Sequence, residues 1–309
     1  MKSASSIHDI DFVSKVSYLY KLFLMRVKGG QSYNLIPWED IREYESILVK
    51  YCPTKQRLVE HQVLEIGYGA RPWRLLSMAS LGVDIKGIDL DRPVYGLNLK
   101  RLGEALKYNG FERFIKSLVR CFLFDTRDLN YLKKELSYLN KKLTIDQSRM
   151  LIGNAAERRH FQDDSFTFVF SEDVFEHIPS ADLPKVLSNI KNWLKNGGIF
   201  VVRPNVWTGI SGGHDPDYYP NDIILEKAPH SKAWLHLLDP NFKVNTYLNR
   251  LRLQDYIELF SKEFEILEIK HKHDRLGEKY LTPDLFKRLS STYSREELLT
   301  NQISFVLRA

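Results

Sequence analysis

Cysteine is scarce in this sequence, since Cys52 and Cys121 are the only two among 309 residues. Two isolated thiols without paired spacing indicate neither a disulfide framework nor a cysteine-based zinc site. We therefore expect a reducing compartment and no bound metal. Internal repeats and low-complexity segments are missing as well.

Long apolar runs are also absent. No stretch approaches the roughly 20 residues that a membrane-spanning helix needs, and the start of the chain lacks the apolar core of a signal peptide. A cytoplasmic location is the expectation. The net charge of +6 is modest for this length, so anionic partners are allowed but not required. No nucleic-acid-binding module is visible, and nothing in the sequence indicates an oligomeric state.

The most informative feature is a pair of short apolar runs that each end in an acidic residue. Residues 63–69 read Val-Leu-Glu-Ile-Gly-Tyr-Gly, and residues 83–89 read Val-Asp-Ile-Lys-Gly-Ile-Asp. This order predicts a strand, a tight glycine turn, a helix and a second strand with Asp89 at its tip. Because glycine has no Cβ, Gly67 and Gly69 let the backbone approach a ligand closely. Asp89 would stand where a ribose presents its hydroxyls.

This turn departs from the fingerprint of dinucleotide-binding proteins. The fingerprint has a third glycine, and Pro72 occupies that position here. Glu65 lies just before the turn, where its carboxylate would repel a pyrophosphate and attract a cationic ligand. Both features argue against an NAD-dependent oxidoreductase, which stays as an alternative.

Glu65, Gly67 and Gly69 together with Asp89 resemble the first motifs of the class I S-adenosylmethionine-dependent methyltransferases. The resemblance continues in Gly-Asn-Ala-Ala-Glu at 153–157, in 163–179, which is similar to the type 11 subset, and in Leu-Lys-Asn-Gly-Gly at 194–198. The motifs keep the family's order over residues 60–205. The departures are Arg71, where the family often has a glycine, and Asn154, where it has aspartate.

The resemblance implies S-adenosyl-L-methionine as the cofactor. Glu65 and the two glycines would hold its methionine end and Asp89 its ribose. Asn154 would frame the adenine, since its side-chain oxygen can accept a hydrogen bond from an exocyclic amine. The cofactor-binding candidates are Glu65, Gly67, Gly69, Asp89, Leu90, Asn154, Ala155 and Ser171.

The implied fold is α/β, a doubly wound (Rossmann-like) sheet of seven mostly parallel strands with an antiparallel last strand. Residues 60–309 would form the catalytic domain, and residues 1–59 a helical extension. Apolar residues at helical spacing predict helices over 12–27 and after Pro37. Further helices are expected at 252–260, 281–285 and 294–299. Strands at 264–270 and 301–308 would close the sheet.

Three segments go beyond what the sheet requires. Residues 92–149 read as a basic insertion of two or three helices, either a solvated face or a lid that favours an anionic acceptor. Residues 204–250 mix aromatic, His, Asp and Asn side chains without periodicity, which suits a structured loop or a site for a hydroxyl-rich ligand. The basic segment 12–28 is expected to pack on the sheet, although its composition also allows peripheral membrane contact.

Methyl transfer from a sulfonium is a direct displacement, so the protein positions the reactants and excludes water. A hydroxyl acceptor must also lose its proton. His214, flanked by Gly212-Gly213 and by Asp215, is the candidate base. His177 is the second catalytic candidate, with a structural role at a helix start favoured for it.

The expected acceptor is a small molecule or glycan, methylated on oxygen. The Asn/Asp-Pro-Pro-aromatic motif of amino-group methylation does not follow the predicted fourth strand, where Ser171-Glu172-Asp173-Val174 stands instead. Two further alternatives remain open: nitrogen or carbon methylation of another small molecule, and a binding protein that kept the fold without catalysis.

Overall fold

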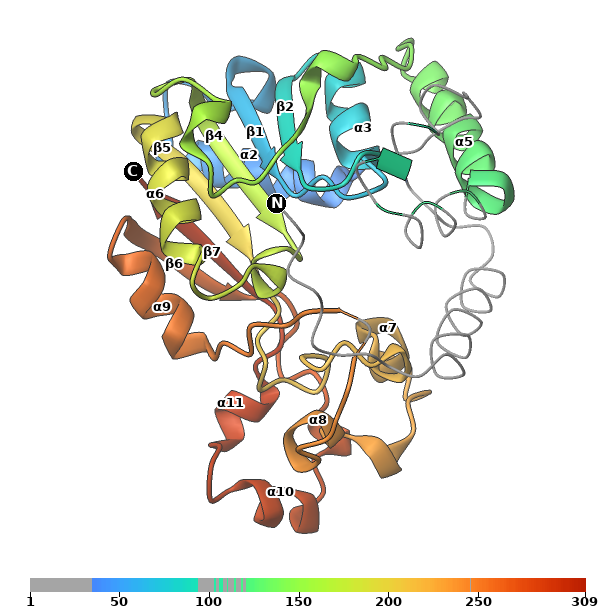
Figure 1. The fold of residues 1–309 in the computed structure, drawn as a ribbon, viewed down its shortest axis with the longest axis vertical. Helices are drawn as coiled ribbons and strands as arrows, with labels where there is room; N and C mark the ends of the chain where they lie inside the picture. The colour runs from blue at the N-terminus through green and yellow to red at the C-terminus, as the bar shows by residue number, and fades with distance from the viewer. Residues whose placement is uncertain are drawn as a thin grey trace. The chain divides into compact units, whose positions relative to one another are not determined.

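The structure is a computed structural model that describes residues 35–93, 121–244 and 246–309, together with residues 103, 106, 107, 110, 114 and 118. Its strands form one seven-stranded sheet in the order β3-β2-β1-β4-β5-β7-β6 (Figure 1). The predicted doubly wound α/β fold is confirmed. The strands are β1 (Gln62–Ile66), β2 (Asp84–Asp89), β3 (Met150–Ile152), β4 (Phe166–Glu172), β5 (Leu194–Arg203), β6 (Glu265–His271) and β7 (Ile303–Arg308).

Helices connect most of these strands. The α-helices are α2 (Trp38–Tyr51), α3 (Trp73–Leu81), α5 (Thr126–Tyr138), α6 (Leu183–Trp193), α7 (Pro220–Ile224), α8 (Leu235–Leu238), α9 (Leu253–Ser261), α10 (Pro283–Leu289) and α11 (Arg295–Leu299). A single π-helical turn, η2 (Cys121–Asp125), leads into α5, and short 3₁₀ turns such as η5 (Phe175–His177) and η6 (Pro216–Tyr218) punctuate the loops.

The described part of the chain divides into two compact units. The N-terminal unit holds residues 35–172, 185–201 and 308–309, and the C-terminal unit holds residues 173–184 and 202–307. Each unit is described by itself below.

The core of the N-terminal unit is built on parallel strands. β1 pairs in parallel with β2 and β4, and β2 with β3, so that Glu65 lies opposite Gly87 on one side and Phe170 on the other. Val63, Leu64 and Val169 have no exposed surface. Parallel strands are covered on both faces, which explains why these segments read as near-continuous apolar runs.

Two helices of this unit follow from their sequences. α2 buries Ile41, Tyr44, Ile47 and Leu48, the four residues whose spacing predicted its inner face. α3 ends at Gly82, which adopts a left-handed backbone (φ 102°) that favours glycine at a helix C-terminus. The turn from α3 into β2 is therefore set locally.

The predicted antiparallel last strand is confirmed by two reciprocal hydrogen bonds. The Gly197 N–H donates to the Ala309 carbonyl, and the Ala309 N–H donates to the Gly198 carbonyl, both at 3.1 Å. In the C-terminal unit an antiparallel bridge joins Asn205 to Gln302.

The C-terminal unit has a core of its own. Trp234 and Leu298 are fully buried and Tyr280 almost so, within a cluster that also includes Ile210 and Tyr218. The segment 204–250 contributes α7, α8 and short 3₁₀ turns to this unit. The helices expected after residue 252 and the two closing strands appear as α9, α10, α11, β6 and β7.

Some predictions fall outside the described residues. They are the helix over 12–27 and most of the first two helices of the insertion. The third helix of the insertion, predicted over 128–139, appears as α5. Cys52 and Cys121 are free thiols. Among the described residues, no helix has the length and apolarity to cross a bilayer.

Candidate functional site

The glycine turn after β1 depends on the conformational freedom of glycine. Gly67 and Gly69 both adopt left-handed conformations, with φ 81° and 69°. Among the described residues, an added Cβ on Gly69 would meet only the backbone nitrogen of Arg71, at 4.0 Å. At Gly69 the described part of the chain therefore leaves room for a ligand to approach the backbone.

Asp89 at the tip of β2 holds this turn in place. Its Oδ2 accepts a hydrogen bond from the Gly69 N–H at 2.7 Å, and its Oδ1 accepts one from the Asp91 N–H at 2.8 Å. Each carboxylate oxygen has a second lone pair, so the group can also accept from a ligand hydroxyl. The next residue, Leu90, exposes 64% of its surface and offers an apolar contact beside the carboxylate.

Glu65 is buried in β1 beneath the turn. Its Oε1 lies 3.2 Å from Nη1 of Arg74, which also pairs with Asp40. Burial raises the pKa of Glu65 to about 7, and the charge of Arg74 opposes this rise. Its Oε2 is buried and has no hydrogen-bond partner among the described residues. One oxygen of Glu65 is therefore bound within the protein and the other is available to a cationic ligand.

The remaining cofactor candidates make hydrogen bonds within the chain. Ser171 is buried, and its Oγ donates to the Ile66 carbonyl at 3.0 Å. Asn154 is exposed, and its Oδ1 accepts from the Ala156 N–H at 2.9 Å. The Ala155 carbonyl accepts from Nδ2 of Asn189 at 2.9 Å. Ser171 thus joins β4 to the end of β1, while Asn154 presents an exposed side chain.

These residues fit S-adenosylmethionine. The buried, unpartnered Oε2 of Glu65 suits the ammonium of the methionine end. The open glycine turn lets the ligand approach, and Asp89 beside the exposed Leu90 suits a ribose followed by an adenine.

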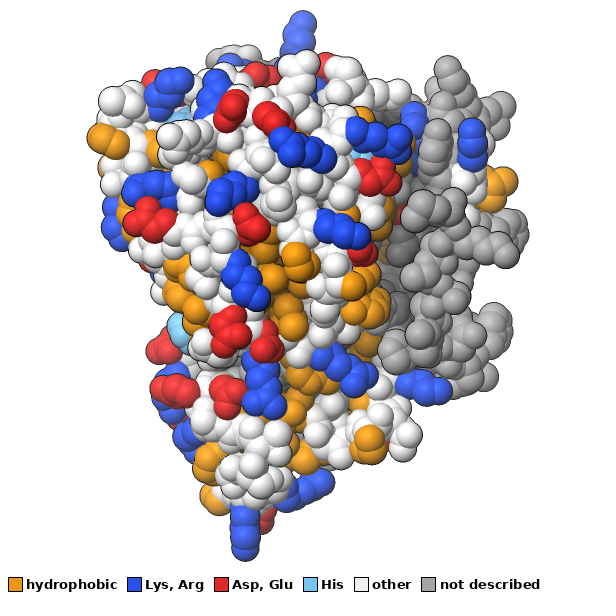
Figure 2. Space-filling view, turned by 60° about the vertical axis from the view of Figure 1, so that its left-hand side comes forward, with side chains coloured by type: hydrophobic (Ala, Val, Ile, Leu, Met, Phe, Trp, Pro, Cys, Tyr) orange, Lys and Arg blue, Asp and Glu red, His pale blue; other side chains and the backbone are white. Residues whose placement is uncertain are grey.

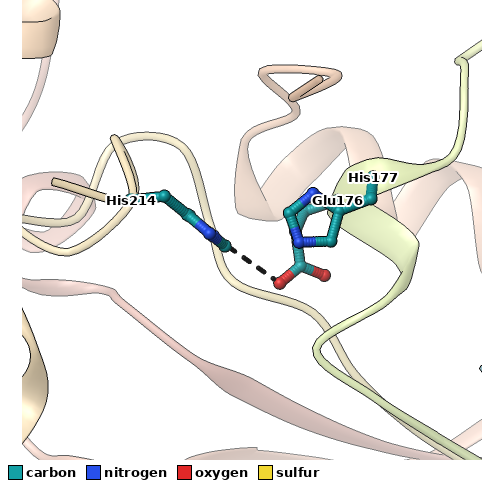
Figure 3. A group of neighbouring side chains, drawn as sticks. All are labelled: Glu176, His177 and His214. Atoms are coloured by element: carbon teal, nitrogen blue, oxygen red, sulfur yellow. Dashed lines mark ion pairs between the residues drawn. The ribbon is translucent and has the colours of Figure 1, made fainter. Parts of the chain in front are cut away.

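A second group of polar side chains gathers in the C-terminal unit. Glu176, His177 and His214 bring one ligand-type atom each to within 4.8 Å of one another (Figure 3). Nε2 of His214 lies 3.7 Å from Oε1 of Glu176, and the two imidazole rings meet edge to face at 4.9 Å. We call these three residues the Glu-His-His cluster.

Neighbouring groups hold two members of this cluster. Nδ2 of Asn205 donates to Oε1 of Glu176 at 2.6 Å. Nδ1 of His177 lies 2.9 Å from the Tyr247 carbonyl, which can only accept, so Nδ1 carries the proton and Nε2 does not. Glu176 and His177 follow directly from the loop after β4, in the 3₁₀ turn η5.

His214 is placed by a tightly packed loop. Its backbone is left-handed (φ 51°), which few residues other than glycine adopt. A Cβ on the preceding Gly213 would come within 2.6 Å of the His236 ring, and Nε2 of His236 is hydrogen-bonded to the Trp207 carbonyl at 2.9 Å. The glycine before His214 is therefore a packing requirement.

Asp215, which follows His214 in the sequence, is engaged by its own backbone. Oδ1 of Asp215 accepts from the Asp217 N–H at 3.0 Å and begins the 3₁₀ turn η6. Glu176 faces the His214 ring instead. Short acidic side chains such as that of Asp215 often bond to the nearby backbone. Glu176, which is distant in the sequence, is the acidic residue that approaches the His214 ring.

Burial dominates the electrostatics of the cluster. It lowers the pKa of His214 to about 3, and the neighbouring His177 and His236 add to this effect. It also lowers the pKa of His177. Burial raises the pKa of Glu176 to about 8, and the Asp173 carboxylate raises it further. Oε2 of Glu176 and Nε2 of His214 are buried without hydrogen-bond partners among the described residues.

Glu176 is the site residue that the sequence did not single out. It stands in the Glu-His pair just after the fourth strand, where only the histidine drew attention as a titratable group near neutral pH. No signal in the sequence links Glu176 to His214, because the two residues lie in separate loops.

Part of the chain matches a known protein family. Residues 109–202 match the family model described as a methyltransferase domain. This segment contains β3, β4, α6 and nearly all of β5, and it follows the glycine turn and Asp89 in the order predicted. The predicted methyltransferase domain is confirmed over this segment. No curated protein matches its sequence significantly.

Solved structures similar to this methyltransferase include several from distant organisms. One is a SAM-dependent methyltransferase from Archaeoglobus fulgidus, with 12% identity, a TM-score of 0.44, and 94% of this chain and 99% of that chain covered. A second is a protein from Pyrococcus horikoshii OT3, with 12% identity, a TM-score of 0.44 and coverages of 94% and 97%. A third is a putative sarcosine dimethylglycine methyltransferase from Galdieria sulphuraria, with 13% identity, a TM-score of 0.43 and coverages of 93% and 97%.

Proposed function

We propose that this methyltransferase transfers the methyl group to an oxygen of a small-molecule or glycan acceptor that is rich in hydroxyl groups. The observation that carries the proposal is the Glu-His-His cluster, in which two buried polar atoms, Oε2 of Glu176 and Nε2 of His214, have no hydrogen-bond partner among the described residues. Buried polar atoms without partners are costly. A bound hydroxyl would satisfy them.

The N-terminal unit would bind the cofactor. S-adenosylmethionine supplies a methyl group that its sulfonium already activates. Oε2 of Glu65 accepts from the ammonium, and Asp89 accepts from the ribose hydroxyls while its hydrogen bond to Gly69 keeps the turn open. Leu90 and Asn154 are exposed and contact the adenine.

The chain itself links these residues to the cluster. Ser171 of β4 lies opposite Ile66 of β1, directly before the glycine turn. Glu176 follows Ser171 by five residues in the sequence. In open α/β sheets, ligands bind at the carboxyl ends of the strands, and Glu176 and His177 lie just beyond that end of β4.

The cluster suits the removal of a proton from a hydroxyl. We infer that the His214 ring takes the proton as the acceptor oxygen attacks the methyl group, and burial keeps this ring neutral beforehand. His177 orients the arrangement, because its ring packs edge to face on that of His214 and its Nδ1–H is anchored on the Tyr247 carbonyl.

A small hollow of about 10 Å³ lies in the same unit. It is lined by Trp207, Phe242, Val244, Thr246, Leu248 and Arg250. Aromatic and apolar walls with a few polar groups are typical of small-molecule sites. Oγ1 of Thr246 lies 3.4 Å from Nδ1 of His177, so the wall of the hollow reaches the cluster.

Surface charge also favours a small acceptor. On the face drawn in Figure 2, Lys and Arg side chains of the described residues are interspersed with Asp and Glu side chains. A nucleic-acid acceptor would favour a continuous basic stripe, which this face does not show among the described residues.

The test is a transfer assay with methyl-labelled S-adenosylmethionine and a panel of nucleotide sugars, glycans and small hydroxyl compounds. We expect label in an ether-linked methyl group of one class of hydroxyl acceptor, and none in the matched analogue that lacks the hydroxyl. Asp89→Ala is the blank with an impaired cofactor site. Label on nitrogen or carbon would contradict the proposal, as would cofactor binding without transfer to any acceptor.

A further inference from the structure

The three residues of the cluster also form a complete set of metal-binding groups. We propose that Glu176, His177 and His214 bind one divalent transition-metal cation. Two imidazoles and one carboxylate are the ligand set of many catalytic transition-metal sites, and they leave coordination positions open for water or an acceptor. No sequence motif predicts this set, because the Glu-His pair and His214 lie in separate loops.

The positions of the ligand atoms are close to those that a cation requires. The three atoms lie within 4.8 Å of one another, and the His214–Glu176 pair is at 3.7 Å. Metal–ligand distances of about 2.1 Å place neighbouring ligands about 3 Å apart. Binding of a cation would draw the three side chains closer together.

One observation independent of this grouping points to a ligand. The Glu176 side chain exposes only 4% of its surface, and its Oε2 has no hydrogen-bond partner within the described residues. A carboxylate oxygen buried without a partner is costly to maintain, and coordination to a cation would satisfy it. Nε2 of His214 is likewise buried without a hydrogen-bond partner among the described residues.

The surrounding hydrogen bonds are those that metal ligands usually make. A metal-bound histidine commonly donates its other N–H to a backbone carbonyl, which fixes the ring and the tautomer. His177 does this through Nδ1 and the Tyr247 carbonyl, which leaves Nε2 unprotonated and ready to coordinate. Ligating carboxylates are likewise hydrogen-bonded, and Asn205 provides that bond to Glu176.

The ligand types select the class of cation. Imidazole nitrogen suits Zn²⁺, Co²⁺ and Fe²⁺, whereas Mg²⁺ and Ca²⁺ prefer all-oxygen sites. A bound cation would lower the pKa of a coordinated acceptor hydroxyl, and His214 would then be a ligand to the cation and not the base. This catalytic use rests on the proposed function, but the binding of the cation does not.

Titration of the full-length, tag-free protein with Co²⁺ tests the site. The protein is first stripped with a chelator and dialysed, and binding is followed by calorimetry and by the visible absorption of Co²⁺. No acceptor is present, so the result is separate from any failure of the acceptor assay. We expect one saturable Co²⁺ per chain, displaced by Zn²⁺ and not by an equal concentration of Mg²⁺.

Variants assign the binding to the cluster. E176Q and H214A should each weaken Co²⁺ binding at least tenfold, and Asn205→Ala about tenfold to a hundredfold, the usual effect of removing a group that supports a ligand. H271A, which removes an exposed histidine of β6, should bind Co²⁺ like the wild type. Circular dichroism and urea unfolding identify the variants that fold.

Two results would overturn the proposal. One is the absence of saturable Co²⁺ binding to the wild-type protein. The other is binding of equal strength in the wild type and in folded E176Q or Asn205→Ala, which would place the cation elsewhere on the chain.

Discussion

Removal of the Asp89 carboxylate should weaken cofactor binding. In the protein, Asp89 accepts hydrogen bonds from the Gly69 and Asp91 N–H groups at 2.7 and 2.8 Å. In the complex it would also accept from the ribose. A hydrogen bond to a charged group contributes about 1.5–3 kcal/mol. Asp89→Ala should therefore raise the dissociation constant of S-adenosylmethionine about 10-fold to 150-fold, at 1.4 kcal/mol for each factor of ten.

A conservative variant, Asp89→Asn, separates charge from shape. Its asparagine side chain would have one acceptor oxygen and one amide group, but both oxygens of the aspartate accept from backbone N–H groups. Either orientation of the amide would place N–H against N–H. Asp89→Asn should therefore also weaken the cofactor, by a smaller factor than the alanine variant because one acceptor remains.

Isothermal titration calorimetry with S-adenosylmethionine, S-adenosylhomocysteine and NAD is the assay. The matched control is Asp91→Ala, which removes a nearby carboxylate but keeps the backbone N–H that donates to Asp89, so its cofactor affinity should stay at the wild-type value. The reasoning is refuted if folded Asp89→Ala binds S-adenosylmethionine within threefold of the wild type. NAD binding tighter than S-adenosylmethionine binding would refute the cofactor assignment itself.

Three other predictions concern turnover and stability. His214→Ala should lower turnover about a hundredfold or more in single-turnover assays while calorimetry shows unchanged cofactor affinity, whereas His271→Ala should leave turnover unaffected. Phe260 is fully buried and packs on three other aromatic rings. Phe260→Ala should therefore lower the free energy of unfolding by about 3–5 kcal/mol, measured by urea unfolding, and a loss below about 1 kcal/mol would contradict this packing. Burial raises the pKa of Glu65 to about 7, so the folded state binds the Glu65 proton more tightly than the unfolded state does. The stability that this proton contributes is therefore fully present below about pH 4.5 and is lost as the pH rises through 7. Urea unfolding should then show Glu65→Gln gaining up to about 3 kcal/mol relative to the wild type between pH 4.5 and 8, and parallel pH profiles would disprove the shift.

The cofactor side of the protein was predictable because its signals are local. The strand, glycine turn and second strand lie within 28 residues, and the turn geometry requires glycine at Gly67 and Gly69. The inner face of α2 likewise follows from helical spacing over a few turns. Each of these features depends on neighbours in the sequence, so the residue types alone indicate them.

The Glu-His-His cluster could not be predicted in the same way. Glu176 and His214 are brought together by contacts between distant segments, such as the bond of His177 to the Tyr247 carbonyl, 70 residues away. The loop of His214 is shaped by the ring of His236, which excludes any side chain at Gly213. Tertiary packing of this kind leaves no periodic pattern in the sequence.

The acidic neighbour of the His214 ring shows the same limit on a single residue. Asp215 is adjacent in sequence, but an aspartate at the start of a turn bonds most readily to the backbone two residues later, and it does so with Asp217. Glu65 is a parallel case, because its partner Arg74 comes from α3 after the turn. In both, the sequence identifies the charged group, but the fold decides which neighbour it meets.

The residues proposed for the cofactor and those proposed for the acceptor stand in different kinds of structure. Groups that would bind the cofactor stand at the ends of regular strands, whose register is set by parallel pairing in the N-terminal unit. Groups that would act on the acceptor stand in loops of the C-terminal unit, between β4 and α6 and after β5. Loops tolerate substitution and insertion more readily than the strands that they connect. The same cofactor chemistry can therefore be kept while the acceptor changes, which is why the cofactor follows from sequence motifs and the acceptor must be established by transfer assays.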